Sequence, residues 1–155
     1  MKLRKYLREE TVAQMGYRKP ITVSPLTPVH EAIAKMQTER VGCVLVVDQG
    51  ALVGIFTERD VLKRVLNVDC STDTPVSELM TPKPAVANES EPIHCVLGRM
   101  HSGGLRHLPV VNDAGQAIGT ISVKRVSSFI ADHFASAVYN LPPEPHQYGA
   151  SREGA

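Results

Sequence analysis

The sequence contains two segments that carry nearly the same pattern of residues. Residues 23–55 read VSPLTPVHEAIAKMQTERVGCVLVVDQGALVGI, and residues 87–120 read ANESEPIHCVLGRMHSGGLRHLPVVNDAGQAIGT. Matching positions are offset by 64 (92 minus 28), as in the pairs Pro28 and Pro92, His30 and His94, Met36 and Met100, and Val46 and Val110. One extra residue near Asn112–Gly115 then aligns Gly54 with Gly119. A duplicated unit of this size usually packs against its twin, because neither half can build a sufficient core alone.

A chain of 155 residues forms one compact body or two small lobes that share a core. Two related units that pack about a pseudo-two-fold axis would also create a cleft with two related pockets. We take that geometry as the main indication of function, ahead of any single residue.

Charge and composition limit the kinds of partner that this chain can bind. The chain has 17 basic and 16 acidic residues, and only 5% of its residues are aromatic. Nucleic-acid and membrane-surface binders usually show a basic excess, and single-strand binders need aromatic platforms. The first residues, MKLRKYLREE, are charged, and no apolar run is long enough to span a membrane. Three cysteines without a CxxC pair fit a reducing compartment. We therefore expect a cytoplasmic protein that binds neither nucleic acid nor membranes.

Hydrophobic periodicity predicts an α+β fold. Each copy is expected to run strand, helix, strand, strand, helix, with Thr27 as the N-cap of the first long helix and Pro28 as its first residue. The predicted organisation is an N-terminal helix at 1–10, a first repeat at 11–70, a linker and lead-in at 71–84, a second repeat at 85–135, and a helix end with a polar tail at 136–155. Short sheets flanked by helices should result.

Two local signatures, together with the lead-in between the copies, give this repeat a family resemblance. Residues 54–60, GIFTERD, are similar to the G-h-x-[ST]-x-x-[DN] element of the cystathionine-β-synthase (CBS) domain, where h is apolar. Residues 106–111, RHLPVV, resemble a strand common in that family, and residues 78–82, ELMTP, resemble its lead-in to a second copy. Residues 11–133 therefore resemble a tandem CBS domain pair, also called a Bateman module. The resemblance implies a regulatory module that binds AMP, ADP or ATP, and in some members NAD or S-adenosylmethionine.

Thr57 and Asp60 support two interpretations. The Thr-x-x-Asp pattern before an apolar pair fits a capping box, in which both side chains serve the start of a helix. The same position also suits a ligand, because free N–H groups there can bind phosphate and a carboxylate can accept hydrogen bonds from a ribose diol. The resemblance implies the second role, with Asp60 on the ribose and Thr57 on ribose or phosphate.

The second copy departs from this pattern, because Arg125 stands where the carboxylate should be. Arginine only donates hydrogen bonds and cannot accept both hydroxyls of a ribose. Either this pocket is degenerate, or Arg125 serves a phosphate. We expect unequal sites, with the Asp60 site better for a nucleoside and the Ser122 site weaker or empty.

Other positions have local alternatives. Arg106 and His107 are either a solvent-facing strand entrance or phosphate contacts. Gly42 either forms a tight turn or admits a flat adenine ring. Arg40, Lys83 and Lys124 are further basic candidates at the rims. With the resemblance, the set of positions expected to contact an adenine nucleotide is Lys19, Ile21, Thr22, Val41, Gly42, Cys43, Thr57, Arg59, Asp60, Val86, Arg106, His107, Pro109, Ser122 and Arg125.

No pattern in the sequence selects a catalytic triad, a Walker lysine loop or a compact set of metal ligands. We therefore expect no enzyme activity, no catalytic cofactor and no bound metal. The leading hypothesis is a sensor of an adenosine-containing ligand that acts on a separate, unidentified protein and itself forms a homodimer. The alternative is a ligand-independent scaffold for dimerisation or docking, favoured by the apolar face of the last helix.

Overall fold

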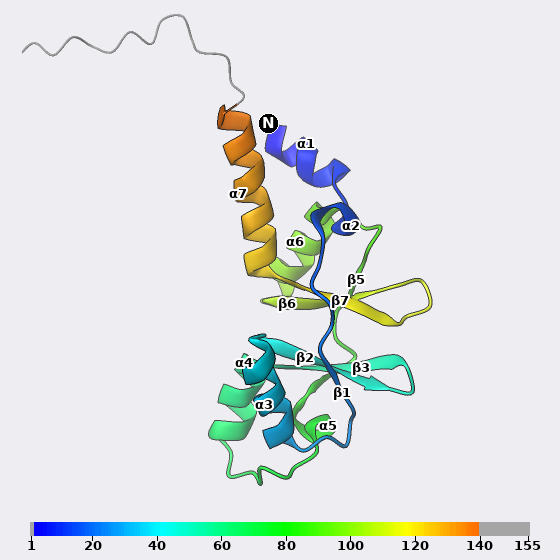
Figure 1. The fold of residues 1–155 in the computed structure, drawn as a ribbon, viewed down its shortest axis with the longest axis vertical. Helices are drawn as coiled ribbons and strands as arrows, with labels where there is room; N and C mark the ends of the chain where they lie inside the picture. The colour runs from blue at the N-terminus through cyan, green and yellow to red at the C-terminus, as the bar shows by residue number, and fades with distance from the viewer. Residues whose placement is uncertain (1, 140–155) are drawn as a thin grey trace, which may run out of the picture.

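The computed structural model describes residues 2–139, which form two lobes, each built on a small sheet with helices beside it (Figure 1). The first lobe has a four-stranded sheet in the order β1-β2-β3-β4, and the second has a three-stranded sheet in the order β5-β6-β7. Both units run strand, helix, strand, strand, helix, so the predicted α+β duplication is confirmed. The elements of the first lobe are β1 (Thr22–Val23), α3 (Val29–Glu39), β2 (Cys43–Asp48), β3 (Ala51–Thr57), α4 (Glu58–Asp60), the π-helix η1 (Val61–Leu66), α5 (Val76–Leu79) and β4 (Thr81–Pro82).

The second lobe contains β5, α6, β6, β7 and α7, together with the two helices that begin the chain. Their bounds are α1 (Lys2–Glu9), α2 (Val12–Met15), β5 (Ala87–Asn88), α6 (Ile93–Gly103), β6 (His107–Val111), β7 (Ala117–Ser122) and α7 (Val123–Tyr139). The ring of Tyr6 in α1 stacks on Phe129 of α7, with ring centroids 5.6 Å apart. Within residues 2–139, no helix has the length and apolar character that crossing a bilayer requires.

The two hairpins show how closely the copies match. The β2–β3 turn uses Gln49 and Gly50 with φ of 47° and 82°, the left-handed pair that a two-residue hairpin favours. The β6–β7 connection is longer, as the extra residue predicted. Each hairpin has a bulge at the same place, between Val46 and Val47 in one and between Val110 and Val111 in the other.

One predicted helix start is wrong. Pro28, rather than Thr27, is the N-cap of α3, and no side chain caps it. The Thr27 hydroxyl instead accepts a hydrogen bond from the backbone N–H of Ser24 at 3.1 Å. Its carbonyl oxygen accepts one from the N–H of Val76 at 2.8 Å. Thr27 is therefore held by pairing with a distant segment, and this fixes where the helix begins.

That pairing belongs to a reciprocal exchange between the repeats. The segment that leads into each repeat packs on the other lobe, so α5 lies on the first lobe and α2 on the second. The N–H of Val76 donates to the carbonyl of Thr27 at 2.8 Å, and the matching N–H of Val12 donates to the carbonyl of Glu91 at 2.9 Å. Pro28 bridges to Pro75 as Thr11 bridges to Pro92. The same contacts therefore occur twice, with the donor and acceptor lobes interchanged.

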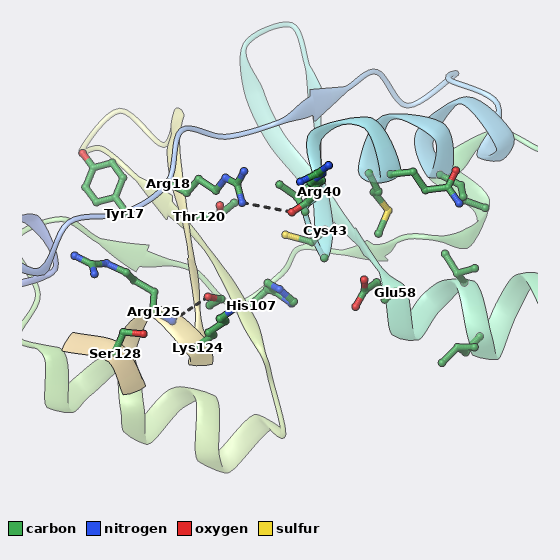
Figure 2. A pocket seen from close by; sticks show the side chains of 18 of the residues that line it. Tyr17, Arg18, Arg40, Cys43, Glu58, His107, Thr120, Lys124, Arg125 and Ser128 are labelled. Atoms are coloured by element: carbon green, nitrogen blue, oxygen red, sulfur yellow. Dashed lines mark hydrogen bonds between the residues drawn. The ribbon is translucent and has the colours of Figure 1, made fainter. Parts of the chain in front are cut away.

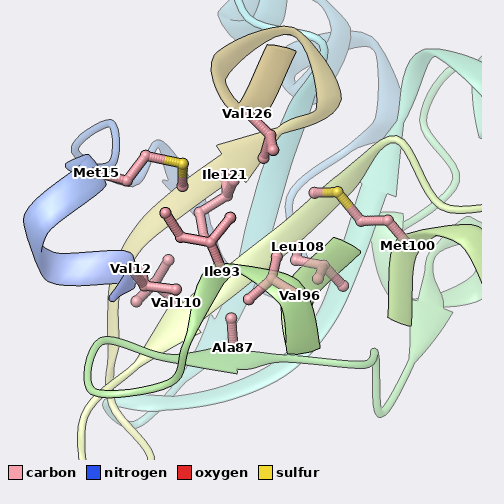
Figure 3. Packing of buried hydrophobic residues seen from close by; sticks show 10 residues of the cluster. All are labelled: Val12, Met15, Ala87, Ile93, Val96, Met100, Leu108, Val110, Ile121 and Val126. Carbon is pink, nitrogen blue, oxygen red and sulfur yellow. The ribbon is translucent and has the colours of Figure 1, made fainter. Parts of the chain in front are cut away.

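The lead-in helices also complete the hydrophobic cores. Val12 and Met15 are at most 1% exposed and pack with buried residues of the second lobe (Figure 3). Val76 is fully buried in the first lobe, against residues such as Val29 and Phe56. Residues 71–84 are therefore more than a connection, because they contain a helix and a strand that the first lobe uses.

After each helix, the exchanged segment forms an edge of the other lobe's sheet. β4 pairs with β3, and Arg18 forms a bridge with Thr120 of β7. These edges approach a strand where it carries glycine. A Cβ on Gly119 would lie 2.1 Å from Cδ2 of Tyr17, and a Cβ on Gly54 would lie 2.2 Å from Sδ of Met80. The aligned glycines Gly54 and Gly119 therefore make room for the exchange.

We predict that Gly119→Ala lowers the free energy of unfolding by about 1–3 kcal/mol, because the new methyl group must displace the Tyr17 ring and the backbone beside it. Gly98→Ala is the matched control. It adds the same methyl group inside α6, where no atom beyond the neighbouring residues and the backbone of the helix itself lies within 4 Å. It should stabilise the protein by about 0.5–1 kcal/mol. Urea denaturation of both variants measures the difference, and equal effects of the two would contradict the packing argument.

Candidate ligand-binding cleft

A cleft of about 1370 Å³ lies between the two lobes, and both contribute to its walls (Figure 2). The first repeat supplies the end of α3 and the start of β2, while the second supplies the end of β7 and the start of α7. The exchanged segment at Gly16–Arg18 closes one side. The polar and charged residues along the walls are Tyr17, Arg18, Gln37, Arg40, Glu58, His107, Thr120, Ser122, Lys124, Arg125 and Ser128.

The cleft brings together part of the set expected from the sequence. Its lining includes Val41, Gly42, Cys43, His107, Ser122 and Arg125. Thr22 instead lines a separate pocket of about 440 Å³ beside Lys35 and Val47. The remaining expected positions do not line either pocket, and they are Lys19, Ile21, Thr57, Arg59, Asp60, Val86, Arg106 and Pro109. Ligand contact at each of these positions stays a prediction.

Thr57 and Asp60 form the capping box that their spacing suggests. Oδ2 of Asp60 accepts from the backbone N–H of Thr57 at 2.9 Å and from the Thr57 hydroxyl at 3.1 Å. The Asp60 N–H donates back to the Thr57 hydroxyl at 3.3 Å. Oδ1 lies 3.6 Å from Nε of Arg64, and Asp60 is only 7% exposed. A ribose that used this carboxylate would have to share it with the cap.

Arg125, which replaces the matching carboxylate, holds the exchanged segment in place. Its guanidinium donates to the backbone carbonyl oxygens of Met15 and Gly16, at the C-terminal end of α2. Arg64 does the equivalent in the first lobe, donating to the carbonyl oxygens of Leu79 and Met80 at 3.1 Å and 2.6 Å. The two arginines therefore make equivalent contacts from positions that are one helical turn apart in the alignment of the repeats. The guanidinium of Arg125 is already hydrogen-bonded to the backbone in this structure.

The centre of the cleft is a contact between the two strand starts. The ring of His107 lies over Gly42, because two of its atoms are 2.8 Å from where a Cβ on Gly42 would be. Burial lowers the pKa of His107, Glu58 opposes this, and Arg106 adds to it, so the neutral imidazole is favoured. Burial also raises the pKa of Cys43 to about 12, with Glu58 adding to the effect. Cys43 is therefore a protonated thiol and a poor nucleophile.

The cleft also contains residues that sequence reasoning missed. Tyr17, Arg18, Thr120 and Glu58 were not among the expected contacts, although all of them line it. A signal for the first two was present, since residues 17–18 match positions 81–82 of the recognised lead-in to the second repeat. Within residues 2–139, no three His, Cys, Asp or Glu side chains are grouped closely enough to hold a metal ion.

Comparison with known proteins identifies the family. The model of the CBS domain matches residues 12–67 and again residues 76–132. The chain therefore belongs to the CBS domain family, as a tandem pair. Each matched stretch begins at a lead-in helix, α2 or α5, so the family unit contains the segment that is exchanged in space.

Relatives of known sequence support this assignment. The CBS domain-containing protein YhcV of Bacillus subtilis is 32% identical over 124 residues, which cover 77% of this chain and 86% of YhcV. Longer relatives also occur. The protein CBSCBSPB1 of Arabidopsis thaliana is 33% identical over 120 residues, which cover 76% of this chain and only 22% of that protein. A pair similar to this one therefore lies within a much larger protein.

Solved structures show the same fold. A protein with CBS domains from Burkholderia ambifaria is 37% identical with a TM-score of 0.71, covering 79% of this chain and 96% of that one. The CBS domain pair of protein MJ0100, in complex with 5′-methylthioadenosine and S-adenosyl-L-methionine, is 25% identical with a TM-score of 0.72, covering 80% and 98%. A Pyrobaculum aerophilum CBS domain protein complexed with AMP is 21% identical with a TM-score of 0.73, covering 82% of this chain and 99% of that one. At this level of identity the comparison shows a shared fold only.

Proposed function

We propose that this CBS pair is a non-enzymatic sensor that binds an adenosine-containing ligand in the cleft between its repeats and signals to a separate protein. The observation that carries the proposal is the cleft itself, since its walls come from both repeats and include four basic side chains. The Arg18 guanidinium lies beside the Arg40 backbone, whereas Lys124 and Arg125 extend from the start of α7 (Figure 2). Such a site suits a ligand that has both a flat apolar part and negative charge.

The relatives support the ligand class. The MJ0100 pair, 25% identical to this chain, holds methylthioadenosine and S-adenosylmethionine. Adenosine is the part these two molecules share. We therefore infer an adenosine moiety as the common element of the ligand.

The mechanism is a shift between two packings of the repeats. A ligand moves such an equilibrium only by its differential affinity for the two states. Because the cleft walls belong to different repeats, a bound ligand would favour the state in which the walls are closest.

The three cysteines among the described residues are free thiols, which supports a reducing cytoplasm as the place of action.

We predict that an adenosine ligand raises the melting temperature of the wild-type protein. At 100 times its dissociation constant, the ligand should add about 2.7 kcal/mol to the free energy of unfolding. A thermal-shift panel of AMP, ADP, ATP, NAD and S-adenosylmethionine measures this, and calorimetric titration then gives the affinity. No response to any of the five would contradict the proposed function.

The same titration tests Asp60 as the ribose contact. Asp60→Asn keeps the shape of the side chain and removes the charged acceptor, so affinity should fall if the ribose uses it. Asp48→Asn is the matched control, because Asp48 is exposed at the end of β2 and does not line the cleft. Unchanged affinity in both variants would remove Asp60 from the site and leave the sensor proposal standing.

A second candidate function is a dimerisation or docking scaffold that needs no ligand. Exposed apolar side chains favour it, namely Leu62 and Leu66 on η1, 60% and 69% exposed, and Val123 and Phe134 on α7, 40% and 45% exposed. We propose that these helices meet a second copy of the chain. Sedimentation analysis should then show a wild-type dimer that Leu66→Glu weakens. A wild-type monomer at all concentrations would contradict a homodimer.

A further inference from the structure

The C-terminal ends of α3 and α6 differ at one position that faces the cleft. Both helices end in a left-handed residue, which is Gly104 in α6 with φ of 60° and Arg40 in α3 with φ of 53°. Glycine takes this conformation freely, whereas a side chain makes it costly. At matching positions, α6 therefore ends in an unstrained glycine, Gly104, and α3 ends in a strained arginine, Arg40. A strained residue that lines a cleft indicates a functional requirement.

Arg40 is also a cation without a partner. Within residues 2–136, its side chain makes no hydrogen bond or ion pair, and the same holds for Lys124 across the cleft. The other two basic side chains are engaged. Arg18 donates to the carbonyl oxygens of Glu39 and Arg40 at 3.2 Å and 3.5 Å, and Arg125 donates to those of Met15 and Gly16. Two free cations thus remain among the described residues of the cleft, one from each repeat (Figure 2).

The charge of the cleft is unbalanced. Arg18, Arg40, Lys124 and Arg125 line it together with a single carboxylate among the described residues, Glu58. Low-dielectric walls focus such an excess and favour a ligand of opposite sign. A cationic sulfonium would add to the excess, and a neutral thioether nucleoside would leave both free cations unmatched. A phosphate chain matches them, because charge-assisted bonds to phosphate are among the strongest available to arginine and lysine.

We propose that the cleft selects a nucleoside di- or triphosphate, with its phosphate chain held between Arg40 of the first repeat and Lys124 of the second. This rests on the proposed function and narrows its ligand class to polyphosphates. The cleft has room for one, since its volume of about 1370 Å³ exceeds that of a typical small-ligand pocket. Because the two cations belong to different repeats, the phosphate chain draws the repeats together when it binds.

The first test compares ligands that share adenosine and differ in charge. Calorimetric titrations use ATP, ADP, AMP, adenosine, methylthioadenosine and S-adenosylmethionine, without added divalent cations. We expect affinity to fall in the order ATP, ADP, AMP, with the uncharged and sulfonium compounds weakest. Lys124→Gln should weaken ATP about tenfold and leave adenosine unchanged. Lys63→Gln is the matched control, because Lys63 is exposed on η1 and does not line the cleft.

The second test separates binding from folding. Arg40→Gly installs the residue that the second repeat already has, so it should keep or raise the melting temperature, by up to about 4 °C. It should nevertheless weaken ATP about tenfold, while adenosine binding stays unchanged. A variant that folds at least as well yet binds ATP less tightly would support a ligand role for Arg40, since lost stability could not explain the weaker binding.

The outcomes distinguish this proposal from the one it rests on. If adenosine compounds bind but Lys124→Gln and Arg40→Gly leave ATP affinity unchanged, the polyphosphate proposal is overturned and the sensor proposal stands. The polyphosphate proposal is also overturned if S-adenosylmethionine binds as tightly as ATP. If neither these six compounds nor NAD binds the wild-type protein, both proposals fail together.

Discussion

The structure depends on the reciprocal exchange of two short helices. α2 and α5 begin the two matched CBS units in sequence but fill the core of the opposite lobe, where Val12 and Val76 are fully buried. Each lobe lacks part of its core without the other's lead-in, so neither repeat can separate from its twin without exposing apolar surface. The exchange also places Gly16–Arg18 on the wall of the cleft. The interlock that stabilises the fold therefore also builds the candidate site.

The two repeats share one fold, but side chains at matching positions have different roles in each. Arg64 and Arg125 bind matching carbonyl oxygens from positions one helical turn apart, and this frees the first repeat to keep Asp60 as a helix cap. The helix ends differ as well, with glycine at 104 and a left-handed arginine at 40. These departures from symmetry occur at positions where one repeat keeps a locally favourable residue and the other does not. Such locally unfavourable residues are typical of binding sites.

Much of the fold was predictable from the sequence, because the duplication and the hydrophobic periods agree. The hairpins, the long helices and the burial of Cys43 follow from local pattern. The exchange was not predictable in this way, because residues 71–84 read as a linker and lead-in, and nothing in their local pattern places Val76 in the core of the first lobe. The candidate site was predicted in part for the same reason. His107 lies in a recognisable motif, and Gly42 and Ser122 align with motif positions of the other copy. Tyr17 and Thr120, in contrast, come together only through the exchanged edge. Glu58 was missed because an exposed acidic residue in a first helical turn has an ordinary structural explanation.

The central claim is that one ligand contacts both repeats across this cleft. The most direct measurement is a titration of ¹⁵N-labelled protein with ATP, followed through the backbone amide signals. The account predicts that the largest shifts occur together on both walls, at Gly42 and Cys43 in the first repeat and at Ser122 and Lys124 in the second. The amides of Ser24 and Thr27, beside the smaller pocket, should not move. Shifts confined to one repeat, or centred on that smaller pocket, would contradict it.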